Sequence, residues 1–426
     1  MNSMIVNSMN DQQEALDMLR RVVTDRYGAH PDRVRVVRSP YRVCPLGAHV
    51  DHQLGPVTAM AIDQSVLLAY APSPSRDVKL SSLDFSGSVC FSLDDVPADQ
   101  TDDWSNFPRG AALTLQRRHR LERGIVGVTS GKLHGGGVSS SAAVGVAFLL
   151  AFEDVNGLRV STEENIELAR QIENDFLGLR IGILDPAAIL LSRRGHLTRI
   201  DCRTSRYELI PATAGMPPFK ILLAFSGLRQ SLVGTDYNRH VHECALAART
   251  LLAAVGRGDS DPALGNVSAD EFAAHKHRLH DAPARRAAHF FSECDRVRRG
   301  VAAWKQGDLV SFGALMTTSG ESSIRNYECG RAPLIDLYHA LIETEGVYGA
   351  RFSGAGFRGC CVALVEPQSL EQVASRVSSA YARRHPDLAE YASVVPCDTD
   401  DGAAIIDTNW DEPRAFFRDG YPSERS

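Results

Sequence analysis

Residues 135–143 read Gly-Gly-Gly-Val-Ser-Ser-Ser-Ala-Ala and lie between a strand-like run at 125–131 and a long apolar helix expected to begin near Ser140. Three consecutive glycines let the backbone approach a ligand in conformations closed to other residues. Amides at the start of a helix, with the helix dipole behind them, form a binding site for phosphate. The stretch therefore predicts a phosphate-binding loop; the alternative is a flexible linker with a serine N-cap.

This loop supplies candidate nucleotide-binding residues. We expect its glycine amides to bind phosphate and its serine hydroxyls to reach a phosphate-bound Mg²⁺. The residues concerned are Gly135, Gly136, Gly137, Ser139, Ser140 and Ser141. The loop is not a Walker A sequence, because the GxxxxGK[ST] pattern is absent.

A polar cluster at residues 42–51, Arg-Val-Cys-Pro-Leu-Gly-Ala-His-Val-Asp, follows a strand-like run at 34–37. In a loop, its carboxylate and imidazole could bind sugar hydroxyls. A tight turn with solvated charges is one alternative. Metal binding through His49, Asp51 and His52 is another, although further well-spaced ligands are missing from the motif.

Two acidic residues twelve positions apart form a third motif. Glu173 lies near the end of an expected helix, and Asp185 precedes Pro186 at the predicted start of the next one. An aspartate before proline is an ordinary N-cap. A carboxylate at a helix N-terminus is also kept ionised by the helix dipole, as a general base requires.

A second glycine-rich loop, Ser-Gly-Ala-Gly-Phe-Arg-Gly-Cys-Cys at residues 353–361, lies between strand-like runs at 347–352 and 360–365. Alone, it could be a hairpin turn. Beside the first glycine loop, it becomes a candidate for phosphate contact.

The remaining pattern predicts an α+β fold without regular βαβ alternation. Helices are expected at 11–28, 102–117 and 370–384, and from a capping box at 161–164 to about Phe176. Strands are expected at 57–62, 66–70 and 219–225. The proline-rich stretch 211–218 suggests a boundary between domains at 1–212 and 213–408, followed by a loose polar tail at 409–426.

The composition bounds the function. With 426 residues, the chain is long enough for two domains, and its net charge of −6 favours neither nucleic acid nor an anionic membrane as a partner. Its nine scattered cysteines and polar N-terminus indicate reduced thiols in the cytoplasm. The longest apolar run, 142–152, is about half the length that spans a bilayer.

Taken together, the four motifs resemble the GHMP small-molecule kinases, and within them the galactokinase branch. The resemblance covers roughly residues 30–400, in the expected order. The stretches PYRVCPLGAHVDHQ, GILD, LLAFSGLRQ and YGARFSGAGFRGCC are similar to the galacturonokinase subgroup. This resemblance implies an N-terminal domain like domain 2 of ribosomal protein S5 and a ferredoxin-like C-terminal domain, with the active site in the cleft between them.

The resemblance also implies roles for single residues. The substrates would be ATP and a small sugar or sugar acid, with Mg²⁺ as cofactor, in a monomer or homodimer. Asp185 would deprotonate the anomeric hydroxyl, and Arg42 would keep Asp185 ionised and stabilise the transferring phosphoryl group. Mg²⁺ would bind Ser141 and Glu173. The other implied residues are His49, Asp51, Gly182 and Tyr237 at the sugar, and Trp104, Gly354 and Gly356 at the nucleotide.

Two departures from the galactokinase pattern favour a substrate with a carboxylate at C6. Galactokinases place a Glu that meets the sugar's 6-hydroxyl where this chain has Ala48. Like charges about 4 Å apart repel by roughly 1 kcal/mol in water and about 4 kcal/mol in a partly shielded site, so Ala48 removes a penalty. Arg180, near the catalytic Asp, is a candidate partner for the carboxylate, or else a surface salt-bridge residue.

The sequence thus leaves three hypotheses: a galacturonokinase, a galactokinase with tolerant C6 recognition, and a non-catalytic relative that senses sugar and ATP. Ser141, Glu173, Asp185 and Arg42 are all intact, which disfavours the third.

Overall fold

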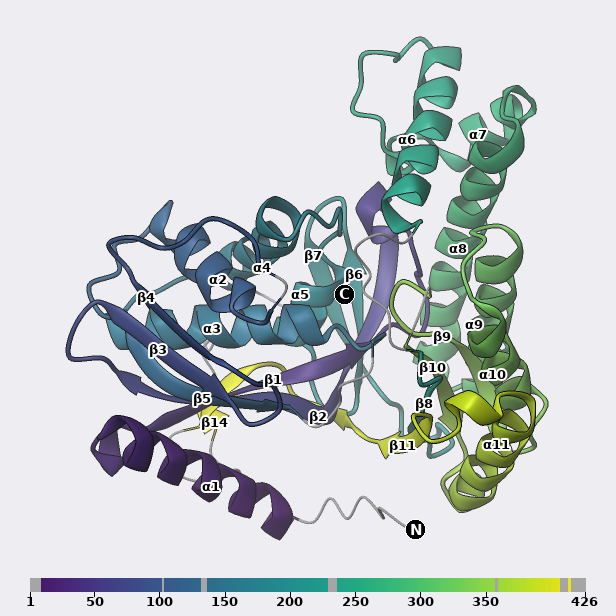
Figure 1. Cartoon of the computed structure of the whole chain (residues 1–426). Helices are drawn as coiled ribbons and strands as arrows, with labels where there is room; N and C mark the ends of the chain where they lie inside the picture. The colour runs from purple at the N-terminus through teal and green to yellow at the C-terminus, as the bar shows by residue number, and fades with distance from the viewer. Residues whose placement is uncertain are drawn as a thin grey trace.

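Two β-sheets, each covered by helices, organise the chain (Figure 1). The structure is a computed structural model that describes residues 9–101, 103–131, 136–228, 236–356, 359–406 and 413–414. Both sheets contain antiparallel pairs with helices segregated to their faces, which confirms the predicted α+β class.

The larger sheet has ten strands, in the order β14-β13-β1-β2-β5-β3-β4, with β6 and β12 also paired to β2 and with β7 paired to β6. Its members are β1 (Arg35–Val43), β2 (Pro56–Pro72), β3 (Asp77–Ser82), β4 (Ser88–Ser92), β5 (Ile125–Gly131), β6 (His196–Asp201), β7 (Arg206–Pro211), β12 (Thr399–Asp400), β13 (Ala404–Ile406) and β14 (Pro413–Arg414).

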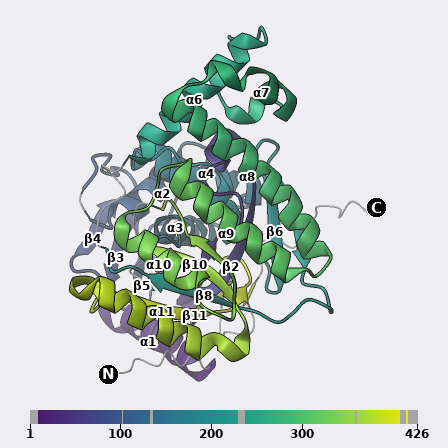
Figure 2. The same ribbon diagram turned by 90° about the vertical axis from the view of Figure 1, so that its right-hand side faces the viewer.

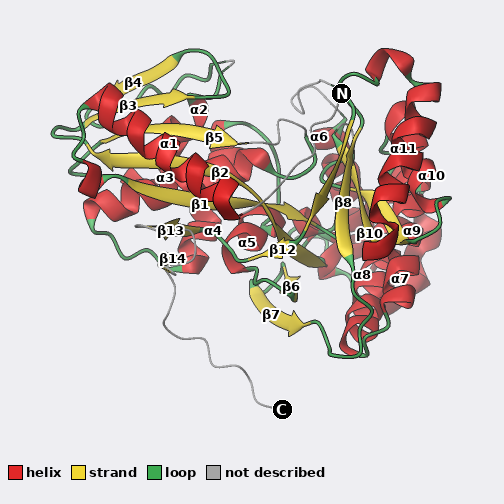
Figure 3. Ribbon diagram, turned by 90° about the horizontal axis from the view of Figure 1, so that it is seen from below, coloured by secondary structure: helices red, strands yellow, loops and turns green. Residues whose placement is uncertain are grey.

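Helices cover both faces of this sheet. On one face lie α2 (Asn106–Gln116), α3 (Ser140–Asn156), α4 (Thr162–Gln171) and α5 (Leu184–Leu191) (Figure 1). Helix α3 is buried along most of its length because it packs between the sheet and its neighbouring helices, which explains its nearly continuous apolar sequence. On the other face, α1 (Met9–Tyr27) packs Leu16, Leu19 and Val23 against the strands (Figure 3).

The smaller sheet has four antiparallel strands in the order β11-β8-β10-β9, formed by β8 (Lys220–Phe225), β9 (Val347–Phe352), β10 (Cys360–Val365) and β11 (Ser393–Cys397). Helices stack over it and extend beyond it (Figure 2). They are α6 (Tyr237–Ala254), α7 (Ala269–His275), α8 (Asp281–Lys305), α9 (Leu309–Arg325), α10 (Ala332–Ile342) and α11 (Leu370–Arg384).

The expected strands at 57–62 and 66–70 are one strand, β2. The polar residues Asp63 and Gln64 do not end it, because the strand changes partners there: it pairs with β6 before them and with β5 after them. The Asp63 amide also donates to the Asp398 carbonyl.

Two helix starts differ from the expectation. Helix α5 begins at Leu184 with Ile183 as N-cap, so Asp185 lies in the first turn instead of capping it. At α4, the Ser161 side chain accepts from the Glu164 amide as expected. The Glu164 carboxylate, however, contacts His119. Among the described residues, therefore, only the first of the two hydrogen bonds of the predicted capping box is present.

Arg42 was expected in a loop but lies inside β1, where it pairs with Ala61 after a register shift between Pro40 and Arg42. Such a bulge turns the following side chain relative to a regular strand.

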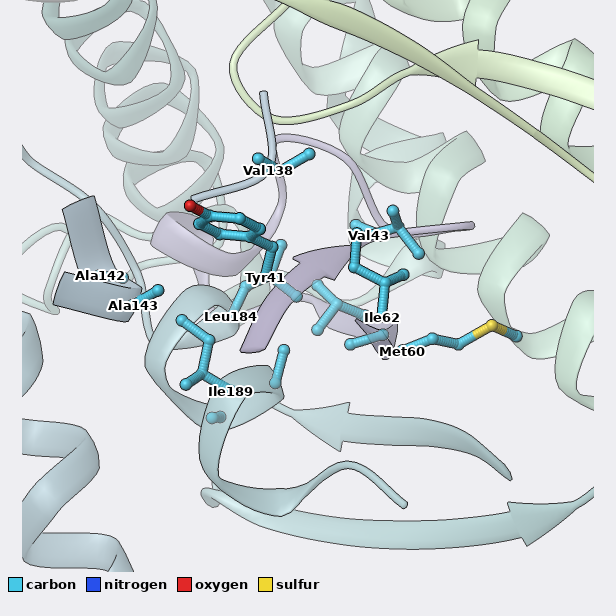
Figure 4. Close-up of a cluster of buried hydrophobic side chains, with 14 of the residues drawn as sticks. Tyr41, Val43, Met60, Ile62, Val138, Ala142, Ala143, Leu184 and Ile189 are labelled. Atoms are coloured by element: carbon cyan, nitrogen blue, oxygen red, sulfur yellow. The ribbon is translucent and has the colours of Figure 1, made fainter. Parts of the chain in front are cut away.

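A buried cluster of hydrophobic side chains surrounds this end of β1 (Figure 4). Tyr41 and Val43 pack there with side chains from β2, from the start of α3 and from α5. The labelled members are Tyr41, Val43, Met60, Ile62, Val138, Ala142, Ala143, Leu184 and Ile189. Strand β1, the start of α3 and α5, which carry three of the sequence motifs, are therefore held in fixed positions relative to one another.

The end of the chain returns to the larger sheet. Strand β12 pairs with β2, and β13 pairs with β1 through Val36 and Ile406. Arg38 of β1 forms a buried ion pair with Asp400. Residues 399–406 thus share a sheet with the first part of the chain, whereas the domain bounds at 212 and 408 stay a prediction. Within the expected tail, Pro413–Arg414 pair with β13.

All nine cysteines lie in the described ranges and are free thiols. Across those ranges, no helix combines the length and the apolar character needed to cross a membrane.

Candidate active site

The side chain of Asp185 is held by two donors from two other elements. Arg42 Nε of β1 donates to Oδ1 at 2.7 Å, and the hydroxyl of Ser139, the N-cap of α3, donates to Oδ2. Burial disfavours the charge of Arg42, but the Asp185 carboxylate outweighs it and raises the pKa of the guanidinium. A carboxylate oxygen can accept more than one hydrogen bond, so Asp185 keeps capacity for a substrate hydroxyl.

The two glycine-rich loops meet at the Gly137 carbonyl. It accepts from Arg42 Nη1 at 3.0 Å and from the Ser353 hydroxyl at 2.6 Å. A Cβ on Gly354 would lie 2.9 Å from the Gly137 Cα, and both residues have positive φ. Only glycine allows this approach, so the two loops lie in contact, while phosphate contact by the second loop stays a prediction.

Glu173 and Ser141 face each other beside this loop. Glu173 is 2% exposed and belongs to a π-helical turn, Ile172–Phe176. Its Oε1 has no hydrogen-bond partner among the described residues. Burial, opposed by a hydrogen bond with Ser141 and reinforced by the nearby Asp185 charge, raises the pKa of Glu173 to about 7.

This arrangement fits a Mg²⁺ ion bound together with nucleotide phosphates. Magnesium takes hard oxygen ligands and usually one or two carboxylates, the rest coming from phosphates and water. The Oε1 atom of Glu173 is a buried acceptor to which none of the described residues donates. A cation would supply the missing positive partner.

The polar cluster at 42–51 contributes Asp51 and His49. Amides of His52 and Leu184 donate to Asp51, while burial and the Asp185 charge raise the pKa of Asp51 to about 6. His49 adopts a left-handed conformation with φ of 60° and stacks on Tyr327 with ring centroids 4.0 Å apart. Burial and the neighbouring His289 hold the pKa of His49 well below its usual value, so the ring is neutral.

Tyr237, the first residue of α6, closes the site from the second half of the chain. It is buried, and its hydroxyl donates to the Arg180 carbonyl at 3.4 Å. The C-terminal helices thus reach the segment that leads into α5.

Behind Ala48 lies a buried cluster centred on Glu293 of α8. Glu293 Oε1 accepts from the amides of Gly47 and Ala48 at 2.8 and 3.1 Å, and Oε2 accepts from Arg296 Nε at 2.6 Å. Burial raises the pKa of this carboxyl, but Arg296 and other positive neighbours outweigh burial and lower it to about 2. Arg351 Nη1 lies 3.7 Å from Oε1.

One cavity brings most of the sequence-predicted residues together. Those that line it are Arg42, Ala48, His49, Asp51, Gly136, Gly137, Ser139, Ser140, Ser141, Glu173, Asp185, Tyr237 and Gly354.

Four other candidates lie outside the lining. The Arg180 side chain is exposed, and only its backbone takes part, through the bond from Tyr237. Trp104 is half-buried against the core. Gly182 backs Asp51, since a Cβ on it would lie 2.5 Å from Asp51 Oδ2, and Gly356 packs on Cys329. Gly135 lies outside the described residues.

Sequence reasoning missed Arg351, the second buried guanidinium at the cavity. A signal was present, because Arg351 is the single charged residue in the otherwise apolar β9. It also missed Glu293, which looks like one of many charges on the helix α8.

The alternative of a metal site at His49, Asp51 and His52 has no support in the geometry. His49 stacks on Tyr327, and His52 Nε2 lies 3.1 Å from the Tyr327 hydroxyl. In the described ranges, no three His, Cys, Asp or Glu side chains gather so as to hold a metal ion.

Family comparisons agree with this geometry. Residues 106–193 match the GHMP kinases N terminal domain, and residues 301–383 match the GHMP kinases C terminal domain. Residues 24–72 match the galactokinase galactose-binding signature.

Individual relatives cover nearly the whole chain. A galacturonokinase of Arabidopsis thaliana is 47% identical over 92% of this chain and 98% of its own length. A galactokinase of Roseiflexus sp. (strain RS-1) is 33% identical over 92% of this chain and 97% of its own length.

The solved structures are consistent with these relatives. The crystal structure of Lactococcus lactis galactokinase complexed with galactose superposes with a TM-score of 0.84 at 27% identity, covering 91% of this chain and 99% of that one. A mevalonate kinase structure, with a TM-score of 0.59 at 15% identity, has the same fold. The chain therefore belongs to the GHMP kinase family.

Proposed function

We propose that the enzyme transfers the γ-phosphoryl group of ATP to the anomeric hydroxyl of D-galacturonate and forms α-D-galacturonate 1-phosphate. Its family and relatives make it a sugar kinase, a phosphotransferase with an alcohol as acceptor. The observation that carries the proposal is a single cavity lined by three features: Asp185, the glycine loop at residues 136–141, and the polar cluster at residues 42–51, called the sugar motif below. Ala48 belongs to the sugar motif.

In this reaction, Asp185 accepts the proton of the C1 hydroxyl. The C1 oxygen then forms a bond to the γ-phosphorus, and the bond from that phosphorus to the bridging oxygen breaks, so ADP leaves. Arg42 and Ser139 hold the Asp185 carboxylate for this step. The Arg42 guanidinium also contacts the Gly137 carbonyl, and so it lies between the base and the phosphate loop. Positioning and fixed charge account for most of the rate in such transfers.

The phosphates would bind the glycine loop and the start of α3, whose amides and dipole favour anions. Ser141 and Glu173 would hold Mg²⁺ there, which supplies charge neutralisation of the phosphates when it is bound. Glu173 Oε1 is available for this role, since no described residue donates to it.

Sugar hydroxyls would bind His49, Asp51 and Tyr237, which line the same cavity. The Asp51 carboxylate accepts hydrogen bonds, and the neutral His49 ring can donate or accept.

Ala48 supports an acidic sugar over a neutral one. Its methyl group contributes no negative charge to the cavity and leaves room for a C6 carboxylate. The 47% identity to the Arabidopsis galacturonokinase supports the same substrate.

D-Galactose is the second candidate, since several relatives are galactokinases and residues 24–72 match a galactose-binding signature. For either sugar, we propose that the enzyme is a monomer or homodimer. We also propose that it acts in the cytoplasm, since nine free thiols fit a reducing compartment.

The test is kcat/KM for galacturonate and galactose with ATP and Mg²⁺, with the product identified by ³¹P NMR as a 1-phosphate. We expect galacturonate to be preferred, and Ala48→Glu to lower its kcat/KM by about tenfold or more through like-charge repulsion. A higher kcat/KM for galactose in the unaltered enzyme would make galactokinase the function.

Asp185→Ala separates an enzyme from a sensor. We expect turnover to fall by about a thousandfold, the size typical of a lost general base, while ATP still binds. Wild-type turnover no greater than that of Asp185→Ala would leave a non-catalytic sugar-binding role.

A further inference from the structure

The guanidinium of Arg351 has bonding capacity that the protein leaves unused. Arg351 lies on β9, is 1% exposed and lines the active-site cavity. Its Nε donates to the Phe352 carbonyl at 3.0 Å. Its Nη1 has no hydrogen-bond partner within the described residues, because the Glu293 oxygen at 3.7 Å is too distant for one.

Glu293 is already satisfied by other groups. Arg296, the Ser319 hydroxyl and the amides of Gly47 and Ala48 all donate to its two oxygens. The buried cluster therefore contains two guanidinium groups and one carboxylate. The neighbouring His289 adds no negative charge, since an imidazole is neutral or positive. A buried positive charge without a partner is costly, and an incoming anion would relieve that cost.

Arg351 lies close to the polar cluster at residues 42–51. One oxygen of Glu293 links it to the Ala48 amide. Burial raises the pKa of Cys44 to about 12, and the Arg351 charge opposes that rise. Burial, His289 and Arg351 together hold the pKa of His49 low. Arg42, by contrast, is the guanidinium bonded to Asp185 and Gly137. Ala48 and His49 line the cavity beside Arg351.

We propose that Arg351 is the specificity-determining residue of the site. Its guanidinium binds the C6 carboxylate of the sugar acid, which lies against the methyl group of Ala48. This inference rests on the proposed function. The substrate carboxylate completes the charge balance of the Glu293–Arg296–Arg351 cluster, and a guanidinium with free N–H groups is suited to bind a carboxylate. A neutral sugar leaves Nη1 without a partner.

Arg180, the cation that the sequence suggested for this role, has its side chain exposed at the surface. Solvent competes for an exposed guanidinium and screens its charge, so it discriminates weakly between an acid and its neutral analogue.

The experiment compares galacturonate with its methyl ester, which has the same ring hydroxyls and no charge, by kcat/KM and by calorimetric binding to the enzyme with a non-hydrolysable ATP analogue. We expect the unaltered enzyme to prefer the acid by about a hundredfold, the loss typical when one partner of a buried charge pair is removed. In Arg351→Met the acid and the ester should differ by less than about threefold.

Arg351→Met also leaves Glu293 with one guanidinium fewer and could impair folding. Glu293 keeps its ion pair with Arg296 in this variant. Arg351→Gln is the second variant, which removes the charge and keeps a polar side chain, and thermal melting with ATP-analogue binding verifies that each variant is folded. Arg180→Met is the matched control, which removes the same charge from outside the cavity and should keep the preference for the acid.

The outcomes separate the two proposals. An unaltered enzyme that does not prefer the acid overturns the proposed substrate. An unaltered enzyme that prefers it, with a folded Arg351 variant that keeps the preference, overturns the role of Arg351 alone. Loss of the preference in Arg180→Met would assign the role to Arg180 instead.

Discussion

Three carboxyl groups, those of Asp51, Glu173 and Asp185, lie around one cavity and repel one another. The Asp185 charge adds to burial in raising the pKa of Asp51 to about 6 and that of Glu173 to about 7. Because the pKa values of Asp51 and Glu173 both respond to the same neighbouring charge, a pH profile reports the two carboxyls together rather than one residue. Ionised forms are needed to bind Mg²⁺ and to accept sugar hydroxyls.

A first prediction is therefore that kcat/KM rises with pH between about 5 and 8, as Asp51 and Glu173 lose their protons. Glu173→Gln should remove the upper part of this rise. It should also increase the Mg²⁺ concentration for half-maximal rate by about tenfold or more, a loss typical for groups that hold a metal in place. Initial rates against pH and Mg²⁺ check both effects.

The exposed Glu163 of α4 provides the control for this prediction. Glu163→Gln should leave the profile and the Mg²⁺ dependence unchanged. An unaltered Mg²⁺ requirement in Glu173→Gln would exclude Glu173 as a ligand.

At the scale of single residues, the sequence predicted much of the candidate site, because the spacing of Glu173 and Asp185 and the two glycine runs are local patterns. Arg351 could not be assigned in the same way. Its strand is local, but the cavity that it faces exists only after β9 packs beside the sugar motif.

At the scale of elements, the contact between the two glycine loops sets the position of the catalytic groups. Ser353 directly follows β9 and donates to the Gly137 carbonyl, which also accepts from Arg42. Ser353 is buried and bonds no reacting group, so it is a positioning residue. Its hydroxyl connects the smaller sheet to the phosphate loop.

Our second prediction is that Ser353→Ala lowers kcat by about tenfold, the order of one buried hydrogen bond, with a smaller change in the KM for the sugar. Ser353→Thr keeps the hydroxyl and should restore most of kcat. Steady-state kinetics of both variants give the answer, and equal losses of kcat in the Ala and Thr variants would argue for a merely structural role.

Helix α3 contains a carboxyl group that the reaction does not use. Glu153 is fully buried; it accepts from Asn165, and its Oε1 has no partner in the described part of the chain. Burial, opposed by the Asn165 bond, raises the pKa of Glu153 to about 8. The folded state therefore holds a proton that the unfolded chain releases near its ordinary, lower pKa.

The third prediction follows from the sign of this shift. The folded protein binds more protons than the unfolded one between the two pKa values, so the Glu153 contribution to stability falls as pH rises toward 8. Glu153→Gln keeps the polar contacts and removes the proton linkage. We expect it to raise the free energy of unfolding by a few kcal/mol at pH 8.5, and by much less at pH 5. Urea unfolding at both values measures this, and equal effects at both would contradict it.

The bounds of a helix or strand were predictable where a single apolar pattern runs through the whole element, as in α3, β5 and β10. The pattern failed at β2 because Asp63 and Gln64 read as a break, while the strand there exchanges one partner strand for another. Local polarity does not reveal which distant strand supplies the hydrogen bonds.

At the scale of the whole molecule, residues 399–406 tie the end of the described chain to its beginning. The Arg38–Asp400 pair lies at this junction with both side chains at most 5% exposed. Asp400 also accepts from Arg194 at 2.7 Å. Removal of one partner from such a pair leaves an uncompensated buried charge.

As a fourth prediction, Asp400→Asn should lower the free energy of unfolding by about 3 kcal/mol, the order found for a broken buried pair. The exposed pair of Lys220 and Asp398 is the matched control, and Asp398→Asn should cost less than about 1 kcal/mol. Denaturant unfolding of the two variants under one condition makes the comparison. Equal losses in the free energy of unfolding would mean that burial of the Arg38–Asp400 pair adds nothing to its contribution to stability.

The presence of two mixed helix and strand segments was predictable from the chain length together with the local helix and strand patterns. The return of 399–406 was not, because a contact between residues more than 350 positions apart leaves no periodic trace in either segment.

This late pairing also matters for how the protein is made. Synthesis delivers β1 early, but its partner β13 is among the last described strands to emerge. During translation, the backbone N–H and C=O groups along the β1 edge at Val36–Arg38 therefore stay unpaired until β13 is made. An unpaired edge of this kind can pair with strands of other chains. A chaperone that covers this edge, or rapid elongation, would shorten the time for which it is unpaired. A premature stop codon a few residues before position 404 would release a chain that keeps every candidate active-site residue named above but lacks the strand that pairs with the edge at Val36–Arg38.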